Sequence, residues 1–517
     1  MKHHGVILGA AMMLTMPLIA ADQVRTDAGT VEGTASADAK IRVFKGIPYA
    51  APPVGALRWK APQPVAKWTD VRKAVEFAPR CMQGHIFDDM VFRDKGGSED
   101  CLYLNVWTPA ADADAHLAVM VWVHGGGFVA GASSEPRQDG ENLARKGVVV
   151  VSMNYRLGVF GFLAHQELTR ESAHNASGNY GLLDQTAALD WVRRNIGYFG
   201  GDPEKVTVFG ESAGSLSVSA LMASPLAQGL FARAIGESGA FFGSTLEAKP
   251  LAVAEFGGAE FVKSLGAGSI RELRAKSADE ILQATLPPHT ARFSPDIDGY
   301  FLPTSVSSIY ESGRQCSVPL LAGWNADEGG YQGIFEKDKP TAKNFARHVR
   351  ALYGKKADAL LNLYPAGTDD EAKRSAGDLA GDRFIAFGTW KWMEMHKATG
   401  ESPVFRYEFD EAPPLAAGDK GESRGAYHSA EIEFVFGALA SKNLPWKPED
   451  TKLSDLMATY WSNFAKTGDP NGEGLPKWPA YGADSHFAVM HLSGNSAAEP
   501  DAHRQRYQFL DSLGAGK

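Results

Sequence analysis

The sequence predicts an α/β fold built on a large, mostly parallel central sheet with helices on both faces. Two features predict it: continuous runs of valine and other apolar residues recur from residue 119 onward, and segments with helical spacing of apolar residues separate them. A strand that is apolar along its whole length is buried on both faces, as parallel strands are. Since no Pro/Gly/Ser-rich linker divides the 517 residues, we expect one domain over residues 22–517.

The expected strands follow in chain order. Short β-prone runs such as 41–44 fill the region up to about residue 110. The longer apolar runs that we assign to the central sheet are 119–123, 148–151, 206–209, 318–322 and 404–409. Their apolar content favours strands that are covered on both faces.

The expected helices lie between these strands. Residues 184–196 place their apolar side chains on one helical face. Two helix-rich stretches, 245–290 and 340–400, include the amphipathic segments 342–353 and 384–396. We expect both stretches to be insertions over the carboxyl edge of the sheet, because no linker isolates them.

Composition and charge exclude some functions. The chain is 44% hydrophobic and 22% charged, as in an ordinary globular protein. Its formal net charge is −9 and it has no Lys/Arg-rich block, so we expect no nucleic-acid partner. No set of histidines, cysteines or carboxylates has metal-ligand spacing, and no glycine-rich loop precedes a Lys-Ser/Thr pair. We therefore expect no metal and no cofactor.

The N-terminus has the pattern of a signal peptide over residues 1–21. Lys2, His3 and His4 precede an apolar stretch at 5–19, and small residues follow it. This stretch is shorter than the roughly 20 residues that span a bilayer as a helix, and no other segment is long and apolar enough. We expect export to the periplasm or the medium, with no stable membrane anchor.

Three cysteines fit an exported protein with one disulfide and one spare thiol. Cys81 and Cys101 are the expected pair, closing a loop that contains several apolar residues. Cys316 precedes the apolar run 318–321, and we expect it to be buried and inert.

The segment Gly210-Glu211-Ser212-Ala213-Gly214 has the layout of a nucleophile elbow. It follows the expected strand 206–209 and leads into a helical stretch at 215–222. Glycines are needed on both sides of the serine, because side chains there would collide with the neighbouring strand or helix. Ser212 is therefore the predicted nucleophile. Ser238, in Gly-Glu-Ser-Gly-Ala, lacks the closing glycine and is expected to be a supporting hydroxyl.

A serine nucleophile needs donors that stabilise the negative charge of the tetrahedral intermediate. The segment His124-Gly125-Gly126-Gly127-Phe128 directly follows the expected strand 119–123 and can aim its N–H groups at one point. We assign Gly126, Gly127 and Ala213 as these oxyanion donors. His124 precedes the nucleophile in the chain, whereas a serine elbow of this type takes its acid and then its histidine from downstream. We place His124 and Glu211 beside the site, as supporting residues.

The general base must come from the downstream histidines, which are His289, His348, His396, His428, His486, His491 and His503. His348 and His396 fall on helical patterns, whereas His428 lies in a loop before an apolar segment, where catalytic groups belong. For the acid, Glu328 follows the strand at 318–322, and the adjacent Asp327 stays open. Asp296 and Asp298, in Pro-Asp-Ile-Asp-Gly, are interpreted as a turn.

Several of these segments together resemble the type-B carboxylesterase (cholinesterase-like, para-nitrobenzyl esterase-like) family over about residues 24–490. The segments that carry the resemblance are 44–50, 98–106, 124–128, 179–185, 210–214 and 427–437. The resemblance implies an α/β-hydrolase fold, a Ser212-Glu328-His428 triad with Glu328 preferred to Asp327, and a Cys81–Cys101 loop beside the active site. It also implies hydrolysis of small-molecule carboxylic esters through an acyl-enzyme on Ser212.

The chain departs from the cholinesterases in one informative way. The loop between Cys81 and Cys101 has no tryptophan with which to stack a quaternary ammonium group, so choline esters are not the expected substrates. The same triad can hydrolyse amides, carbamates or lactones, which stay as alternatives. A non-catalytic binding protein is disfavoured because serine, acid, histidine and glycine loop are all retained. Core packing is the expected role of four phenylalanines that could also line a pocket: Phe241, Phe242, Phe293 and Phe384.

Overall fold

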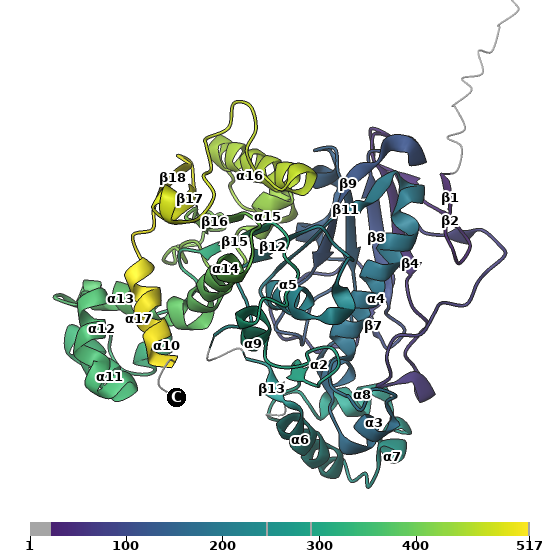
Figure 1. Cartoon of the computed structure of the whole chain (residues 1–517), viewed down its shortest axis with the longest axis horizontal. Coiled ribbons are helices and arrows are strands. Elements are labelled where there is room, and N and C mark those ends of the chain that lie inside the picture. Colours follow the sequence, from purple (N-terminus) through teal and green to yellow (C-terminus); the bar gives the residue numbers. More distant parts are fainter. Residues whose placement is uncertain (1–21, 244–246, 290–291, 515–517) are drawn as a thin grey trace, which may run out of the picture.

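A computed structural model describes residues 22–243, 247–289 and 292–514. The expected signal peptide, residues 1–21, lies outside this range. Within the described residues, the centre of the fold is an eleven-stranded sheet in the order β18-β17-β16-β15-β12-β11-β9-β10-β8-β4-β3 (Figure 1). The stretch from β10 to β17 is parallel, and the strands beyond it at both edges are antiparallel. The predicted α/β-hydrolase architecture is confirmed.

The strands of this sheet are β3 (Thr34–Ala35), β4 (Arg42–Pro48), β8 (Tyr103–Thr108), β9 (Leu117–Val123), β10 (Val149–Met153), β11 (Gly201–Glu211), β12 (Arg233–Glu237), β15 (Leu320–Asn325), β16 (Val404–Phe409), β17 (Ala488–Leu492) and β18 (Ala497–Pro500). Each apolar run assigned to the central sheet forms a strand. Two further parallel strands, β12 and β17, were not predicted, because charged or polar residues interrupt their short apolar runs.

Smaller strands pair outside the central sheet. They are β1 (Gln23–Arg25), β2 (Thr30–Glu32) and β5 (Arg72–Lys73) in one group, β6 (Arg80–Cys81) with β7 (Gly97–Ser98), and β13 (Lys249–Pro250) with β14 (Asp296–Ile297).

Helices cover both faces of the sheet, and alternate side chains of the strands pack against them. On β9, Val121 belongs to the core shared with α4 (Tyr180–Asn195), α5 (Ala213–Ala223) and α14 (Phe387–Thr399). Its neighbour Trp122 points to the other face, into the core shared with α16 (Pro448–Thr467). This alternation with a period of two residues explains why the parallel strands are apolar throughout.

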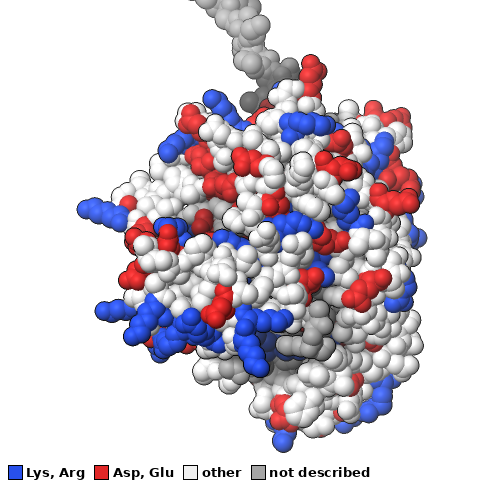
Figure 2. All heavy atoms as spheres, turned by 60° about the vertical axis from the view of Figure 1, so that its left-hand side comes forward, with Lys and Arg blue, Asp and Glu red and all other residues white. Residues whose placement is uncertain are grey.

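The two helix-rich stretches form helical layers beside the sheet. The first contains α6 (Leu251–Ser264), α7 (Ile270–Arg274) and α8 (Ala278–Gln283). The second contains α10 (Gln332–Phe335), α11 (Ala342–Tyr353), α12 (Ala357–Leu363), α13 (Asp369–Gly381) and α14. Helices α10–α13 have a hydrophobic cluster of their own, which α17 (Arg504–Gly514) joins, and they lie at the left of Figure 1. Acidic and basic side chains are interspersed over this side of the molecule (Figure 2).

The remaining short helices are α1 (Glu141–Ala144), α2 (Gly158–Phe162), α3 (Gln166–Glu171), α9 (Val306–Glu311) and α15 (Ile432–Val435). Among the described residues, no helix has both the length and the apolar character that a membrane span requires.

The predicted disulfide between Cys81 and Cys101 is confirmed. It closes a loop that we call the disulfide loop, residues 81–101. Cys316 is a free, half-buried thiol, and burial raises its pKa to about 11, so that the unreactive thiol form prevails at neutral pH.

Candidate active site

Ser212 lies in the tight turn between β11 and α5. Its backbone angles, φ 56° and ψ −120°, define a conformation that costs a non-glycine residue about 1–3 kcal/mol. A Cβ on Gly210 would lie 2.6 Å from the carbonyl oxygen of Val123, and one on Gly214 would lie 2.0 Å from the same atom. The steric reason for both glycines is therefore confirmed. The turn holds the Ser212 hydroxyl at the head of α5.

The structure brings Ser212, His428 and Glu328 together from three separate loops. Nε2 of His428 lies 2.9 Å from the Ser212 hydroxyl oxygen. Nδ1 of His428 lies 2.6 Å from Oε2 of Glu328. Glu328 follows β15, and His428 lies between β16 and α15. The imidazole can thus accept the serine proton on one side while the carboxylate orients it on the other.

The second oxygen of Glu328 is also fixed. Oε1 accepts hydrogen bonds from the Ser238 hydroxyl at 2.5 Å and from the backbone N–H of Asn325 at 2.9 Å. Ser238 therefore contacts the same carboxyl group that contacts His428. The neighbouring Asp327 instead accepts the N–H of Ala426 at 2.8 Å, so the imidazole has Glu328 as its acid partner.

Glu211, the residue before the serine, is buried against the imidazole. Its Oε1 lies 3.3 Å from Nε2 of His428. Burial raises the pKa of Glu211 to about 7, against the attraction of His428 and Arg137. Burial by itself would lower the pKa of His428, but attraction to Glu328 and Glu211 outweighs it and raises that pKa above its ordinary value.

The glycine loop lies directly against the elbow. A Cβ on Gly125 would be 3.1 Å from Cβ of Ser212. Gly126 and Gly127 have φ values of +101° and +62°, and the turn is closed by hydrogen bonds from Val129 and Ala130 to the Gly126 carbonyl. Within the described part of the chain, no backbone hydrogen bond uses the N–H of Gly126 or Gly127. Together with the N–H of Ala213 at the head of α5, these groups can serve an anion.

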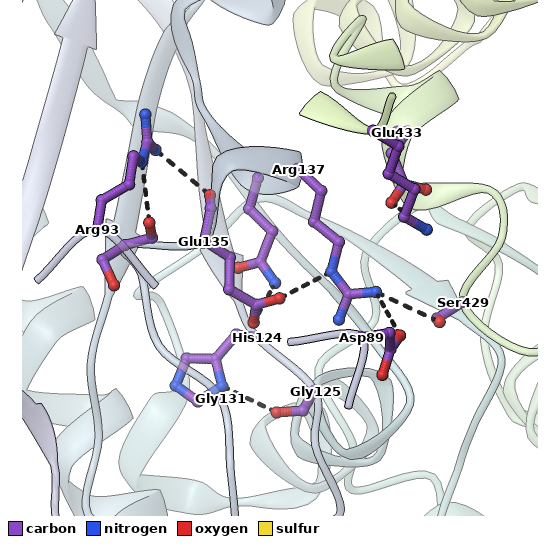
Figure 3. A network of polar contacts seen from close by, with 12 residues as sticks. Asp89, Arg93, His124, Gly125, Gly131, Glu135, Arg137, Ser429 and Glu433 are labelled. Atoms are coloured by element: carbon purple, nitrogen blue, oxygen red, sulfur yellow. Dashed lines mark hydrogen bonds and ion pairs between the residues drawn. The ribbon is translucent and has the colours of Figure 1, made fainter. Parts of the chain in front are cut away.

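His124 is bonded within the glycine loop. Its Nδ1 lies 2.9 Å from the carbonyl oxygen of Gly125 (Figure 3). Its ring stacks on Tyr155 with centroids 4.4 Å apart. Burial lowers its pKa to about 4, which keeps the imidazole neutral. His124 therefore lies against the glycine loop, and its supporting role stays a prediction.

Two of the alternative histidines and one of the alternative acids have other partners. His348 on α11 pairs with Asp338, and His396 on α14 is buried with Nε2 2.8 Å from the carbonyl oxygen of Val318. Asp298 accepts the N–H groups of Tyr300 and Leu302, so it closes the turn that the sequence suggests. Asp296 lies in the two-residue strand β14.

Among the described residues, Glu408, Asp410 and His491 form a group whose ligand atoms lie within 4.8 Å of one another. Glu408 and His491 are partners on the neighbouring strands β16 and β17. Nδ1 of His491 is already 2.8 Å from Asp410, and Arg406 lies 3.7 Å from Glu408. These protein contacts account for all three side chains, so we assign no metal to them.

Three of the four phenylalanines pack in the core as expected, and one does not. Phe241, Phe242 and Phe293 are buried against other aromatic rings. Phe384 is 41% exposed, and its ring lies edge-on to His428 with centroids 5.4 Å apart. The expectation of core packing is wrong for Phe384, because a π-helical turn at Asp382–Ala386 precedes α14 and breaks the α-helical periodicity assumed there.

Comparisons with known proteins agree with this geometry. The model of the Carboxylesterase family matches residues 20–510. A para-nitrobenzyl esterase from Bacillus subtilis is 38% identical, covering 94% of this chain and 98% of its own. A medium-chain fatty acyl-CoA hydrolase precursor from Anas platyrhynchos is 38% identical over 92% of this chain and 89% of its own. A fumonisin B1 esterase from Sphingopyxis macrogoltabida is 37% identical over 88% and 84%.

Solved structures show the same fold. A para-nitrobenzyl esterase structure at 35% identity covers 95% of this chain and 100% of its own, with a TM-score of 0.78. A carboxylesterase from Geobacillus stearothermophilus at 32% identity covers 94% and 99%, with a TM-score of 0.80. The chain therefore belongs to the carboxylesterase family and is a carboxylic ester hydrolase.

Proposed function

We propose that Ser212, His428 and Glu328 hydrolyse carboxylic esters through an acyl-enzyme. The observation that carries the proposal is the unbroken relay from the Ser212 hydroxyl through His428 to Glu328, with distances of 2.9 and 2.6 Å. His428 takes the serine proton as Ser212 attacks the ester carbonyl, and Glu328 stabilises the imidazolium that forms. The same proton then goes to the leaving alcohol.

Deacylation repeats these steps with water. His428 removes a proton from a water molecule, which attacks the acyl carbonyl. His428 then gives this proton to the oxygen of Ser212 as the bond to the acyl carbon breaks and the carboxylic acid leaves. In both halves the carbonyl oxygen becomes negative, and we assign its stabilisation to the N–H groups of Gly126, Gly127 and Ala213. Each such donor contributes about 2.7–4 kcal/mol to lowering the barrier.

The neighbouring residues act through this relay. Ser238 and the Asn325 N–H fix the rotamer of Glu328, and Glu211 stabilises the charged form of His428. His124 supports the glycine loop by its bond to Gly125. None of these supporting side chains needs to contact substrate.

The preferred substrates in this proposal are small-molecule esters with an apolar group. Phe384 offers an exposed aromatic edge beside His428. A hollow of about 120 Å³ lies between Ala130 of the glycine turn and Ile86, Phe87 and Met90 of the disulfide loop. Amide, carbamate and lactone hydrolysis would use the same relay, but the similar proteins named above are hydrolases of esters or thioesters.

Replacing Ser212 tests the proposal. We expect Ser212→Ala to abolish both turnover of p-nitrophenyl butyrate and labelling by a fluorophosphonate, while the thermal unfolding midpoint stays close to that of the wild type. Ser264→Ala, on the exposed side of α6, is the matched control and keeps full labelling. A labelled Ser212→Ala protein would assign the nucleophile to another serine.

We also propose that residues 1–21 are removed on export and that 22–517 fold as one domain. The disulfide and the N-terminal pattern support export. One domain is supported by the continuity of the sheet from β3 to β18. Mass spectrometry of the exported protein should give a chain that begins near Asp22, and limited proteolysis should yield no stable half of the molecule.

A further inference from the structure

Arg137 is a buried arginine that takes no part in the proton transfers proposed above. It lies in a 3-10 turn at Pro136–Gln138, and its side chain is 7% exposed. Burying a guanidinium is costly unless it is paired, and Arg137 is paired: its Nε donates to Oε2 of Glu135 at 2.8 Å. Figure 3 shows the rest of the guanidinium aimed between two loops.

One nitrogen of Arg137 reaches both of these loops. Nη1 lies 3.4 Å from Oδ2 of Asp89, in the disulfide loop, and 3.5 Å from the hydroxyl of Ser429. Ser429 directly follows His428, and its φ of +70° is the left-handed conformation that a non-glycine residue adopts only when its surroundings hold it. Arg137 is therefore one of the contacts that hold the backbone beside His428.

The other end of Arg137 is tied to the sheet. Oε1 of Glu135 accepts a hydrogen bond from Nε2 of Gln138 at 3.0 Å. Oε1 of Gln138 in turn accepts one from the indole N–H of Trp122 at 2.8 Å, and Trp122 lies in the buried strand β9. The chain of bonds thus runs from the rigid centre of the sheet to the two loops.

The loop that carries His428 is also held by Asn325. Its amide donates to the carbonyl oxygen of Tyr427 at 2.8 Å and to Oε2 of Glu431 at 2.5 Å. Asn325 is the last residue of β15, and it also fixes Glu328 through its N–H. Arg137 supplies a second, independent support on the Ser429 side. The two contacts hold the residue before His428 and the residue after it, which is what a fixed imidazole orientation needs.

The charge of Arg137 matters as well as its geometry. Buried carboxyl groups of Glu135, Glu211 and Glu433 all lie close enough to attract it. Lys442 pairs with Glu433 at 2.6 Å. Arg137 is therefore the cation that compensates the charges of Glu135 and Glu211. Removing the guanidinium alone would leave these acids buried with less compensation.

We propose that Arg137 is a positioning residue for ester hydrolysis, which ties the disulfide loop and the histidine loop to the sheet and so keeps His428 aligned between Ser212 and Glu328. This inference rests on the proposed function. It predicts that the two loops are coupled through one side chain, although 48 and 292 positions separate Arg137 from Asp89 and Ser429.

The first test separates kcat from KM. We expect Arg137→Met, combined with Glu135→Gln to avoid an unpaired buried acid, to lower kcat for p-nitrophenyl butyrate on the order of 10- to 100-fold, since misalignment of a catalytic group is costly. KM should change little, because Arg137 does not contact substrate. Arg137→Lys, which keeps the charge, should recover part of kcat. Wild-type kcat in a folded double variant would overturn the inference.

Arg93→Met is the matched control. Arg93 ties the same disulfide loop to the same segment, through the carbonyl oxygens of Ser134 and Glu135 and the carboxylate of Asp139. None of these contacts involves the histidine loop. We expect its kcat to stay within about twofold of wild type, as for other partly exposed substitutions. An equal loss of kcat in both variants would mean that general loosening of the disulfide loop is responsible.

A second test does not depend on removing the buried arginine. Asp89→Ala and Ser429→Ala each remove one contact of Nη1 and should each lower kcat several-fold in the wild-type background. In the Arg137→Met/Glu135→Gln background they should lower it no further, because the side chain that carries their effect is gone. Full additivity would refute the coupling. Activity persisting in Ser212→Ala would instead refute the proposed function, so the two failures are distinguishable.

Discussion

Oε1 of Glu211 lies 3.3 Å from Nε2 of His428, on the nitrogen that also faces the Ser212 hydroxyl. The imidazole is thus placed between two carboxylates, Glu328 on Nδ1 and Glu211 on Nε2. Glu328 orients the ring, whereas Glu211 acts on its charge. The two acids also differ in their bonding: Ser238 and a backbone N–H fix Glu328, while Oε1 of Glu211 has no hydrogen-bond donor among the described residues.

Replacing Glu211 should shift the pH profile in a defined direction. An ionised Glu211 favours the imidazolium and raises the pKa of His428, so Glu211→Gln should lower that pKa. Since the neutral imidazole is the base, activity rises as pH passes its pKa, and the acid limb of kcat/KM should move to lower pH by about one unit or more.

The measurement is the pH dependence of kcat/KM for p-nitrophenyl acetate. Glu260→Gln, on the exposed face of α6, serves as the control for loss of one negative charge. An acid limb that stays in place or moves to higher pH in Glu211→Gln would contradict the electrostatic role.

Removing the Ser238 hydroxyl should loosen the position of Glu328 while the carboxylate itself stays in place. A hydrogen bond to a charged group is worth about 1.5–3 kcal/mol, so Ser238→Ala should lower kcat roughly 10- to 100-fold. Ser219→Ala is the matched control, because its buried hydroxyl bonds the N–H of Phe241 and not the acid. If both variants lose stability but only the Ser238 variant loses kcat, the effect comes from Glu328.

Two glycine substitutions distinguish a steric clash in the glycine loop from the cost of a positive φ. A Cβ on Gly126 would lie 2.2 Å from the carbonyl oxygen of Ala130, whereas one on Gly127 would meet only Val129, at 3.8 Å. Gly126→Ala should displace a proposed oxyanion donor and lower kcat about 10²- to 10³-fold. Gly127→Ala carries only the backbone penalty of its positive φ and should lose less. Equal losses of kcat would place the critical donor elsewhere.

The disulfide should stabilise the protein measurably. Cys81 and Cys101 are 20 positions apart, and loops of that length are worth about 3 kcal/mol of unfolding free energy. Denaturant unfolding of a Cys81→Ala/Cys101→Ala variant should show that loss, and Cys316→Ala should not. If the thiol of Cys316 reacts readily with a maleimide in the folded protein, its expected inertness is wrong.

The parts of the site that could be predicted are those with a local signature. Ser212 was found because a strained turn requires glycines on both sides and a strand and helix around it. Only the resemblance to the carboxylesterase family distinguishes Glu328 from Asp327, because two adjacent carboxyl groups have the same chemistry in the sequence. In the structure Asp327 turns to the Ala426 N–H, a long-range contact that no local pattern contains.

The parts that could not be predicted depend on contacts distant in sequence. No local pattern distinguishes Arg137 from other charged residues, because its partners are brought to it only by the fold. Strand β12 carries Arg233 and Glu237 at its ends, so its apolar run was too short to stand out. The exposure of Phe384 is not predicted, because a π-helical turn points its side chain in another direction than a regular α-helix would.

Phe384 should set the preference for apolar esters. Its ring is 41% exposed at the edge of His428, so it can contact an apolar group of a bound ester without being needed for folding. Phe384→Ala should raise KM for p-nitrophenyl hexanoate several-fold, in line with the roughly 1–3 kcal/mol of a partly buried aromatic contact, and should leave KM for the acetate ester nearly unchanged. Phe242→Ala, a buried ring packed on Tyr310, is the contrasting variant and should lose stability. An equal KM increase for both esters in Phe384→Ala would mean that the ring affects binding in general and does not set the preference for apolar esters.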